Sequence, residues 1–318
     1  MLVLGIETSC DETAVSVVEN GRHIRANVVS SSLNFHKRYK GVVPEIASRL
    51  QLESIVVVLA DAIEQAGVSL KDIKLIAVTS HPGLSGSLLV GNCFARALGF
   101  AQGIPLIAVD HLQAHLYSGF FNRHKPNFPF VGLVVSGGHT SLFYLKSFTK
   151  IKLLGLTQDD ACGEAFDKVA TILGLGYPGG PLIEKLAKQG NRNRINFRCS
   201  NTQNPLNFSF SGIKTAVLYK VEKLKAEGKN GAADVAASFQ EAVIDALVDK
   251  THLACKLKKA NQLVIGGGVA ANNRLREKFM QAAEANNLDI YFSPKEFCTD
   301  NAAMVAGLGY WLFKGVGK

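Results

Sequence analysis

The sequence predicts an α/β protein built from two copies of one βββαβαβ unit, and three observations support this class. Short apolar runs that predict buried strands alternate with longer stretches of helical periodicity. Glycine directly follows two of the predicted helices, at Gly67 and Gly103, as expected of helix C-terminal caps. The same order of elements recurs in the second half, although the residues do not repeat. We therefore expect a duplicated protein whose halves face each other across a cleft.

The first copy is expected to occupy residues 1–125. Asn20 and Gly21 form a strong hairpin-turn signal between its second and third strands. Its predicted elements are strands near 2–6, 14–18 and 22–29, a helix at 47–66, a strand at 75–79, a helix at 87–102 and a strand at 106–109.

The second copy is expected to occupy residues 126–318, with helical insertions and a final helix that packs back on the first lobe. Its predicted elements are strands near 130–136, 140–146 and 151–154, helical segments between 162 and 258, a strand at 263–265, a helix at 272–286, a strand at 289–292 and a closing helix at 301–313. This order resembles the actin, sugar-kinase and chaperone-ATPase superfamily (ASKHA), whose members hold a nucleotide between two lobes. The resemblance predicts a nucleotide cleft here.

The composition narrows the class of protein. With 47% hydrophobic and 19% charged residues, the chain predicts an ordinary globular protein. Its net charge of +9 suggests a polyanionic partner, nucleic acid first among the candidates, although charge also serves solubility. The six cysteines form no C-x-x-C pair, which favours reduced thiols in the cytosol. We expect a cytoplasmic protein, because no signal peptide and no apolar run near the ~18 residues of a membrane span is present.

Two histidines four residues apart, His111 and His115, directly follow an apolar strand that ends at Asp110. On a helix they share one face, close enough to bind one metal ion. Such pairs are common on surface helices that bind nothing, but this one opens a helix at a strand's carboxyl end, where α/β proteins place ligands. Leu112 stands where a zinc peptidase needs glutamate. The pattern therefore indicates a metal site without peptidase chemistry.

A carboxylate is the natural third partner for two imidazoles and a hard or borderline metal. Asp300 lies just before the last predicted helix, in the run Cys298-Thr299-Asp300-Asn301. Thr299 or Asp300 could instead serve only as the N-cap of that helix. The sequence by itself leaves both roles open.

Three turns rich in glycine or hydroxyl groups suggest phosphate contacts. Residues 8–13 and 136–140 occupy equivalent turns of the two copies, and residues 266–272 leave a strand and enter a helix. Glycine lets backbone N–H groups approach phosphate oxygens, and Asn272 could bond a ribose or a base edge. A single glycine pair usually marks a plain turn, but three at equivalent places favour a nucleotide site.

Further polar groups belong to the same hypothesis. Asp167 lies on a predicted helix with an apolar face, where a solvated carboxylate is the simpler interpretation. The glycine-dense run 174–181 precedes a helix that carries Glu184. A loop of this kind in front of a helix suits close approach to a ribose or phosphate.

These stretches together resemble one family, the universal tRNA adenosine threonylcarbamoyltransferases, which include bacterial TsaD and its KEOPS-complex counterpart and were once called sialoglycoprotein endopeptidases. The resemblance runs in order over nearly the whole chain. Its segments are 5–13, 41–45, 87–91, 111–115, 134–140, 163–168, 173–181, 208–215, 238–240, 266–272 and 298–304.

The resemblance implies transfer of threonylcarbamoyl from threonylcarbamoyl-AMP to the exocyclic amine of the adenosine 3′ of the anticodon, in tRNAs that read codons beginning with A. His111, His115 and Asp300 would hold one divalent metal, iron or zinc. The residues that it implies for the adenylate are Val134, Val135, Ser136, Gly137, Gly138, Asp167, Gly180, Glu184 and Asn272. Its partners would be tRNA, a paralogous subunit (TsaB) and a small ATPase (TsaE), which allows for ATP with magnesium at the level of the complex.

Roles for other residues follow as hypotheses. Asp11, in the first turn, is our candidate for orienting the incoming amine or taking its proton. Lys37, Arg38 and Lys40 are candidates for contacts with tRNA phosphates.

The chain departs from the family pattern at three positions. His81 replaces a usual glycine and Gln51 a common histidine, and Val134 stands where archaeal members place a tyrosine metal ligand. The third departure leaves the identity of the metal open.

Two other functions remain to be weighed against the transferase. A small-molecule kinase of the same fold would use nucleotide-bound magnesium without imidazoles, so the two histidines argue against it. A catalytically silent scaffold subunit of the same complex would have no need of His111, His115 and Asp300.

Overall fold

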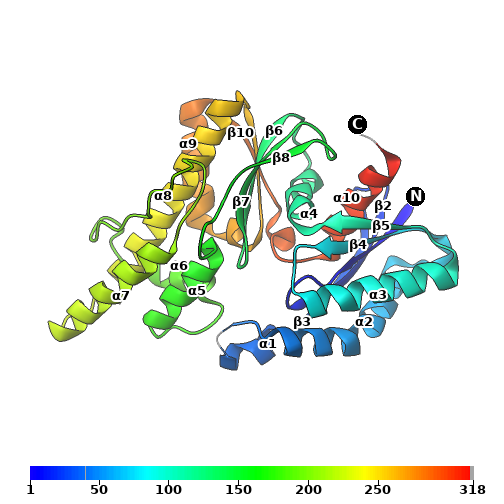
Figure 1. Cartoon of the computed structure of the whole chain (residues 1–318), viewed down its shortest axis with the longest axis horizontal. Helices are drawn as coiled ribbons and strands as arrows, with labels where there is room; N and C mark the ends of the chain where they lie inside the picture. Colours follow the sequence, from blue (N-terminus) through cyan, green and yellow to red (C-terminus); the bar gives the residue numbers. More distant parts are fainter. Residues whose placement is uncertain (40, 316–318) are drawn as a thin grey trace. The chain divides into compact units, whose positions relative to one another are not determined.

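The computed structural model describes residues 1–39 and 41–315, and it divides into two compact units (Figure 1). The first unit comprises Met1–Lys125, Ser147–Lys150 and Glu296–Lys318. The second comprises Pro126–Lys146 and Ile151–Lys295. The closing helix of the chain therefore belongs to the first unit.

The first unit contains a five-stranded sheet in the order β3-β2-β1-β4-β5. Its strands are β1 (Leu2–Glu7), β2 (Glu12–Glu19), β3 (His23–Ser31), β4 (Ile73–His81) and β5 (Leu106–Asp110). β2 is antiparallel to β1 and β3, whereas β4 and β5 run parallel to β1. The predicted hairpin is confirmed: Asn20 and Gly21 both have positive φ, which matches the twist of the flanking strands.

Helices pack on both faces of this sheet. They are α1 (Leu33–His36), α2 (Pro44–Ala66), α3 (Ser85–Gln102), α4 (His111–Tyr117) and α10 (Ala302–Lys314). Leu4 and Ile6 form a core with α2 and α3, while a Cβ on Gly5 would lie 2.2 Å from the carbonyl oxygen of Ala302 in α10. Because successive residues of a strand point to opposite faces, α2 and α3 cover one face and α10 the other.

The second unit repeats this topology, with the sheet order β10-β9-β6-β7-β8. Its strands are β6 (Phe130–Val135), β7 (Thr140–Leu145), β8 (Ile151–Leu156), β9 (Gln262–Gly266) and β10 (Asp289–Phe292). Its helices are α5 (Cys162–Ile172), α6 (Gly179–Ala187), α7 (Ser211–Ala226), α8 (Ala232–Lys258) and α9 (Asn273–Asn286). Three antiparallel strands are again extended by two parallel ones, so the predicted duplication is confirmed.

The predicted elements exist, and most differences lie at their ends. α2 begins at Pro44, three residues earlier than the apolar periodicity predicts, because proline suits the first helical turn. Gly67 and Gly103 end α2 and α3 with φ of 64°, as expected for left-handed caps. Among the described helices, none combines the length and the hydrophobicity that crossing a bilayer requires.

Candidate metal centre and nucleotide-binding surface

His111 and His115 lie on α4, which starts at the residue after β5. Asp110, the last residue of β5, fixes this start, because its Oδ1 accepts the backbone N–H of Gln113 at 2.8 Å. The two imidazoles project from one side of the helix, with ring centroids 4.6 Å apart. Both residues are buried, with exposed fractions of 4% and 0%. The predicted helix and its shared face are therefore confirmed.

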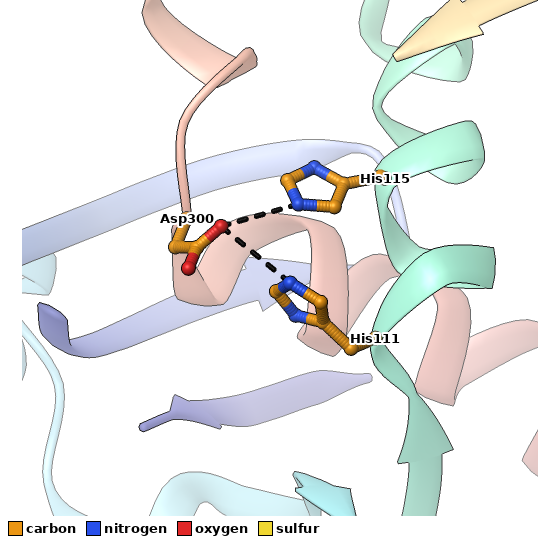
Figure 2. A group of neighbouring side chains, drawn as sticks. All are labelled: His111, His115 and Asp300. Atoms are coloured by element: carbon orange, nitrogen blue, oxygen red, sulfur yellow. Dashed lines mark hydrogen bonds and ion pairs between the residues drawn. The ribbon is translucent and has the colours of Figure 1, made fainter. Parts of the chain in front are cut away.

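Asp300 points at both imidazoles rather than capping α10 (Figure 2). Its Oδ1 lies 3.1 Å from Nε2 of His115 and 3.6 Å from Nε2 of His111. The cap is provided by Asn301, whose Oδ1 accepts the backbone N–H of Met304. The alternative that the sequence left open, Asp300 as an N-cap, is therefore wrong.

The three side chains fit a divalent metal ion. One donor atom from each of them can be chosen so that all lie within 4.8 Å of one another. Ligands about 2.1 Å from a tetrahedral ion are about 3.4 Å apart, so small side-chain adjustments would close the set around an ion. Two imidazoles and one carboxylate suit zinc, and they also form the facial triad of non-haem iron(II).

Glu7, to which the sequence assigned no role, contacts this cluster through His111. It ends β1, is fully buried, and its Oε2 lies 3.1 Å from Nδ1 of His111. Its carboxylate also accepts the hydroxyl of Thr79 and the backbone N–H of Ser9. A carboxylate on the outer nitrogen of a histidine fixes the ring so that the other nitrogen faces a metal. A charged residue at the end of a fully buried strand was the signal that could have revealed it.

The carboxylates set the protonation of this cluster. Burial disfavours the charged imidazolium, but Glu7 and Asp300 outweigh it and raise the pKa of His111 to about 9. Burial also opposes the ionisation of Glu7, yet His111 holds the pKa of that carboxyl below its usual range. Burial and the charge of Asp11 raise the pKa of the Cys10 thiol, which favours the neutral thiol at neutral pH.

Asp11 lies in the turn between β1 and β2, in the electrostatic neighbourhood of Asp300. Burial, and next the charge of Asp300, raise the pKa of Asp11. The turn is held in place by Gln51, whose Nε2 donates to the carbonyl oxygens of Cys10 and Glu12 at 2.9 and 3.0 Å. Asp11 therefore lies within electrostatic reach of Asp300, and Gln51, a departure from the family pattern, supports the turn that carries it.

The other residues flagged in the first unit lie in different settings. His81, with Nε2 3.3 Å from Asp110, neighbours the residue that caps α4. Lys37 and Arg38 form a short 3₁₀ turn after α1, where Lys37 donates to Asn34 and Arg38 stacks on Tyr39. Lys40, the third predicted phosphate contact, lies outside the described residues.

In the second unit, the turn between β6 and β7 packs on the start of α5. Ser136 donates its backbone N–H to the carbonyl of His139, and its own carbonyl accepts the N–H of Gly163. Val134 and Val135, predicted to contact the adenylate, are fully buried strand residues. Neither their side chains nor their backbone atoms present accessible surface to a ligand in this structure.

The remaining predicted residues of the second unit gather around α6. Asp167 accepts the backbone N–H of Gly179 at 2.6 Å, which ties α5 to the start of α6. Glu184 accepts both the backbone and the side-chain N–H of Asn273. Asn272 caps α9 and donates to Gln240, so both ends of its amide have protein partners.

The glycines of this surface fall into two classes. A Cβ on Gly163, Gly179 or Gly267 would lie within 2.8 Å of backbone or Cβ atoms of neighbouring segments, so close packing requires glycine there. A Cβ on any glycine of the second class would find no atom of the described chain within 4 Å, and none of these has a positive φ. This class comprises Gly137, Gly138, Gly180 and Gly268. Neither packing nor backbone conformation requires glycine at these four positions, and they leave bare backbone open to a ligand.

Comparisons with known proteins agree on one family. The sequence profile of the tRNA N6-adenosine threonylcarbamoyltransferases (TsaD) matches residues 23–307. Proteins of that name from Syntrophus aciditrophicus and Thermosipho melanesiensis are 49% and 52% identical to this chain. Those alignments cover 97% and 99% of the chain and 91% and 96% of the relatives.

Solved structures support the fold alone. Full-length HypF matches with a TM-score of 0.66 at 14% identity, over 98% of this chain and 55% of that one. Component A of (R)-2-hydroxyglutaryl-CoA dehydratase from Acidaminococcus fermentans matches with a TM-score of 0.57 at 15% identity, over the full length of both chains. These likenesses and the repeated strand order agree with the duplicated ASKHA fold. With its profile match and its relatives near 50% identity, the chain belongs to the tRNA N6-adenosine threonylcarbamoyltransferase family.

Proposed function

We propose that this protein transfers a threonylcarbamoyl group from threonylcarbamoyl-AMP to N6 of the adenosine 3′ of the anticodon in tRNAs reading codons that begin with A. In this reaction the amine nitrogen bonds to the carbonyl carbon of the mixed anhydride. The bond from that carbon to the phosphate oxygen breaks, AMP leaves, and the amine loses one proton. The observation that carries the proposal is the cluster of His111, His115 and Asp300, with both histidines buried, in a chain whose relatives bear the name of this transferase.

The reaction requires help because an exocyclic adenine amine is a poor nucleophile. Nε2 of His111, Nε2 of His115 and a carboxylate oxygen of Asp300 would hold one divalent metal, iron(II) or zinc(II). A metal there would supply Lewis acidity to the carbonyl and to the departing phosphate. Glu7 would hold His111 so that Nε2, not Nδ1, faces the metal, which its 3.1 Å contact with Nδ1 supports.

Asp11 is our candidate for orienting the incoming amine or accepting its proton. Its place near Asp300, in a turn pinned by Gln51, supports this role. The Asp11→Ala variant should lose transfer activity while it keeps its affinity for the adenylate. An equal loss of both would rule out this role.

The adenylate would lie against the open glycines of the second unit, near Ser136, Asp167 and Glu184. The buried residues Val134, Val135 and Asn272 would lie behind this surface and shape it. Backbone N–H groups at Gly137 and Gly138 would donate to the phosphate. Because the side chain of Asn272 has protein partners at both ends, we assign it to shaping this surface together with Gln240.

A paralogous subunit would dock on the outer face of α2 and α3. These helices contact each other, and Leu52, Val56, Leu89 and Phe100 on them are exposed. Large exposed apolar groups on neighbouring helices are typical of interaction sites. The family resemblance adds tRNA, a small ATPase and a cytoplasmic location to this proposal.

The direct test measures transfer of labelled threonylcarbamoyl from its adenylate to unmodified tRNA, with both partner proteins supplied. Wild-type protein should form modified adenosine, whereas His111→Ala should not. Equal activity in the two proteins would support the transferase activity but would rule out a role for the metal in its mechanism. Failure of wild-type protein with metal and partners bound would instead favour a scaffold or a kinase.

A further inference from the structure

One long stretch of the second unit carries charge of a single sign. From Lys185 to Val221 the chain contains no Asp and no Glu. Its charged residues are Lys185, Lys188, Arg192, Arg194, Arg198, Lys214 and Lys220. Five of the seven lie between 185 and 198, where α6 ends and an irregular segment begins, and all five are exposed. We call residues 185–198 the basic segment.

The irregular part of the basic segment is held firmly along α8. Asp234 accepts the backbone N–H of Asn191 at 2.7 Å. Ser238, one turn further along α8, donates to the carbonyl of Asn191 and accepts the N–H of Ile195. Residues four apart lie on one face of a helix, so α8 provides a straight row of anchors.

Two packing contacts reinforce these anchors. A Cβ on Gly190 would lie 2.1 Å from the carbonyl oxygen of Ala233, so the backbone runs directly against α8. Phe197 is buried, although its neighbours Asn196 and Arg198 are exposed. Because backbone atoms and one phenyl ring make the contacts, the segment is ordered without using its cationic side chains.

The cations of the basic segment remain available for a partner. Among the described residues, Lys185, Lys188, Arg194 and Arg198 take part in no ion pair that the structure records. The acidic groups nearby are already engaged. Asp234 and Glu184 accept backbone N–H groups, and Glu241 binds Arg274 and Lys278. Glu277, which pairs with Arg274, also interacts with Arg192, so the charge of Arg192 is partly compensated.

We propose that the basic segment is a docking surface for the phosphate backbone of tRNA, with Arg194 and Arg198 as its main contacts. Guanidinium groups match phosphate geometry, and the anchored backbone that carries them already has a defined path before RNA binds. The segment starts at Lys185 in the last turn of α6, about 8 Å along the helix from Gly180. That separation would let nucleotides beside the reacting adenosine rest on it. The proposal rests on the transferase function, since tRNA is the substrate of that reaction.

The test compares wild-type protein with R194A/R198A, both in the presence of the partner proteins, saturating adenylate and metal. Transfer is measured against tRNA concentration, and tRNA affinity is measured by fluorescence anisotropy at several salt concentrations. We expect the KM for tRNA to rise roughly tenfold or more with little change in kcat. The slope of log affinity against log salt should become shallower by about 1.4 to 1.8, since each lost phosphate contact removes about 0.7 to 0.9.

The matched control is K71A/K74A, which removes two exposed positive charges from the first unit. The KM of this control for tRNA should stay within twofold of the wild-type value, and its salt slope should stay within 0.5 of the wild-type slope. A thermal melt should show both double variants folded, because within residues 1–39 and 41–315 neither pair of side chains forms an ion pair or belongs to the core.

Unchanged KM and salt slope in R194A/R198A would overturn the docking surface, and so would an equal change in the control. A second result would also overturn the proposal. If R194A/R198A lowers the transfer rate only when the ATPase is present, and tRNA affinity is unchanged, the segment binds an acidic protein partner instead of tRNA. Failure of the proposed function is distinguishable. In that case wild-type protein makes no modified tRNA, whereas the anisotropy comparison still decides whether these arginines bind RNA.

Discussion

The two sheets share one strand order, yet the ends of their strands carry opposite kinds of groups. In the first unit, β1 ends at Glu7 and β5 runs directly into His111, so buried ionisable side chains meet there. In the second, the equivalent strand β6 ends in the turn with Gly137 and Gly138, where side chains are absent and backbone is open. One duplicated scaffold therefore carries a candidate side-chain site in one copy and a candidate backbone site in the other.

This difference has a physical reason. A metal needs a few donor atoms of strong basicity held in fixed positions, which only side chains such as His and Asp provide. A phosphate needs several N–H donors aimed at its oxygens, which bare backbone provides. The two halves can be tested separately, because a change in one should leave the binding property of the other intact.

The largest effect is expected for His115→Ala. Loss of one of the three proposed metal ligands should abolish stoichiometric metal binding and lower the transfer rate by roughly 100- to 1,000-fold. Affinity for a non-hydrolysable adenylate analogue should stay within a few-fold, because that surface belongs to the second unit. Metal analysis, kinetics and calorimetric titration with the analogue would check this, with His124→Ala as the control for an exposed histidine. A large loss of analogue affinity would show that the two sites are not separable.

Glu7→Gln should have the next largest effect. Replacing the carboxylate that orients His111 should weaken metal binding by about 10- to 100-fold while the protein remains folded. Competition with a chelator measures this affinity, and a thermal melt in the presence of the chelator reports the structural contribution separately. If metal affinity is unchanged and only the melting temperature falls, Glu7 serves the fold and not the metal.

Two neighbouring glycines test the backbone site. Gly180→Ala should lower affinity for the adenylate analogue roughly tenfold and change stability by no more than about 1 kcal/mol, because its Cβ meets only open space. Gly179→Ala should instead destabilise the protein by about 1–3 kcal/mol, since its Cβ would lie 2.6 Å from that of Ala170. Denaturant unfolding and analogue titration measure both. A stability loss at Gly180, or none at Gly179, would contradict the division of glycines into two classes.

The smallest effect concerns a charge cluster of the second unit that we assign to stability alone. Burial opposes the ionisation of Glu241, but Arg274 and Lys278 overcome it and lower its pKa to about 2. A lowered pKa stabilises the fold above the unfolded value near 4.5, and this contribution fades as pH falls from there to about 2. Glu241→Gln should therefore cost about 1–2 kcal/mol at pH 7 and progressively less below pH 4.5. Denaturant unfolding from pH 7 to pH 3 checks the sign, and a constant difference would contradict it.

The sequence by itself determined much of this protein. Periodicity, glycine caps and the Asn20-Gly21 turn predicted the order of strands and helices, because these signals are local. The spacing of His111 and His115 determined a shared helical face for the same reason. The repeated order of elements indicated the duplication without any repeated residues.

Only the tertiary structure decided which groups meet. Asp300 lies 185 positions from His115 in the sequence. Because Asn301 already caps α10, no local signal requires Asp300 to turn inward. Its contact with both imidazoles depends on how α10 and α4 pack. Glu7, at the end of β1, reaches His111, which follows β5, across the one intervening strand β4. Packing against α5 likewise decides the difference between Gly179 and Gly180. Sequence patterns report periods of two to four residues, whereas these contacts are set by the packing of segments far apart in the chain.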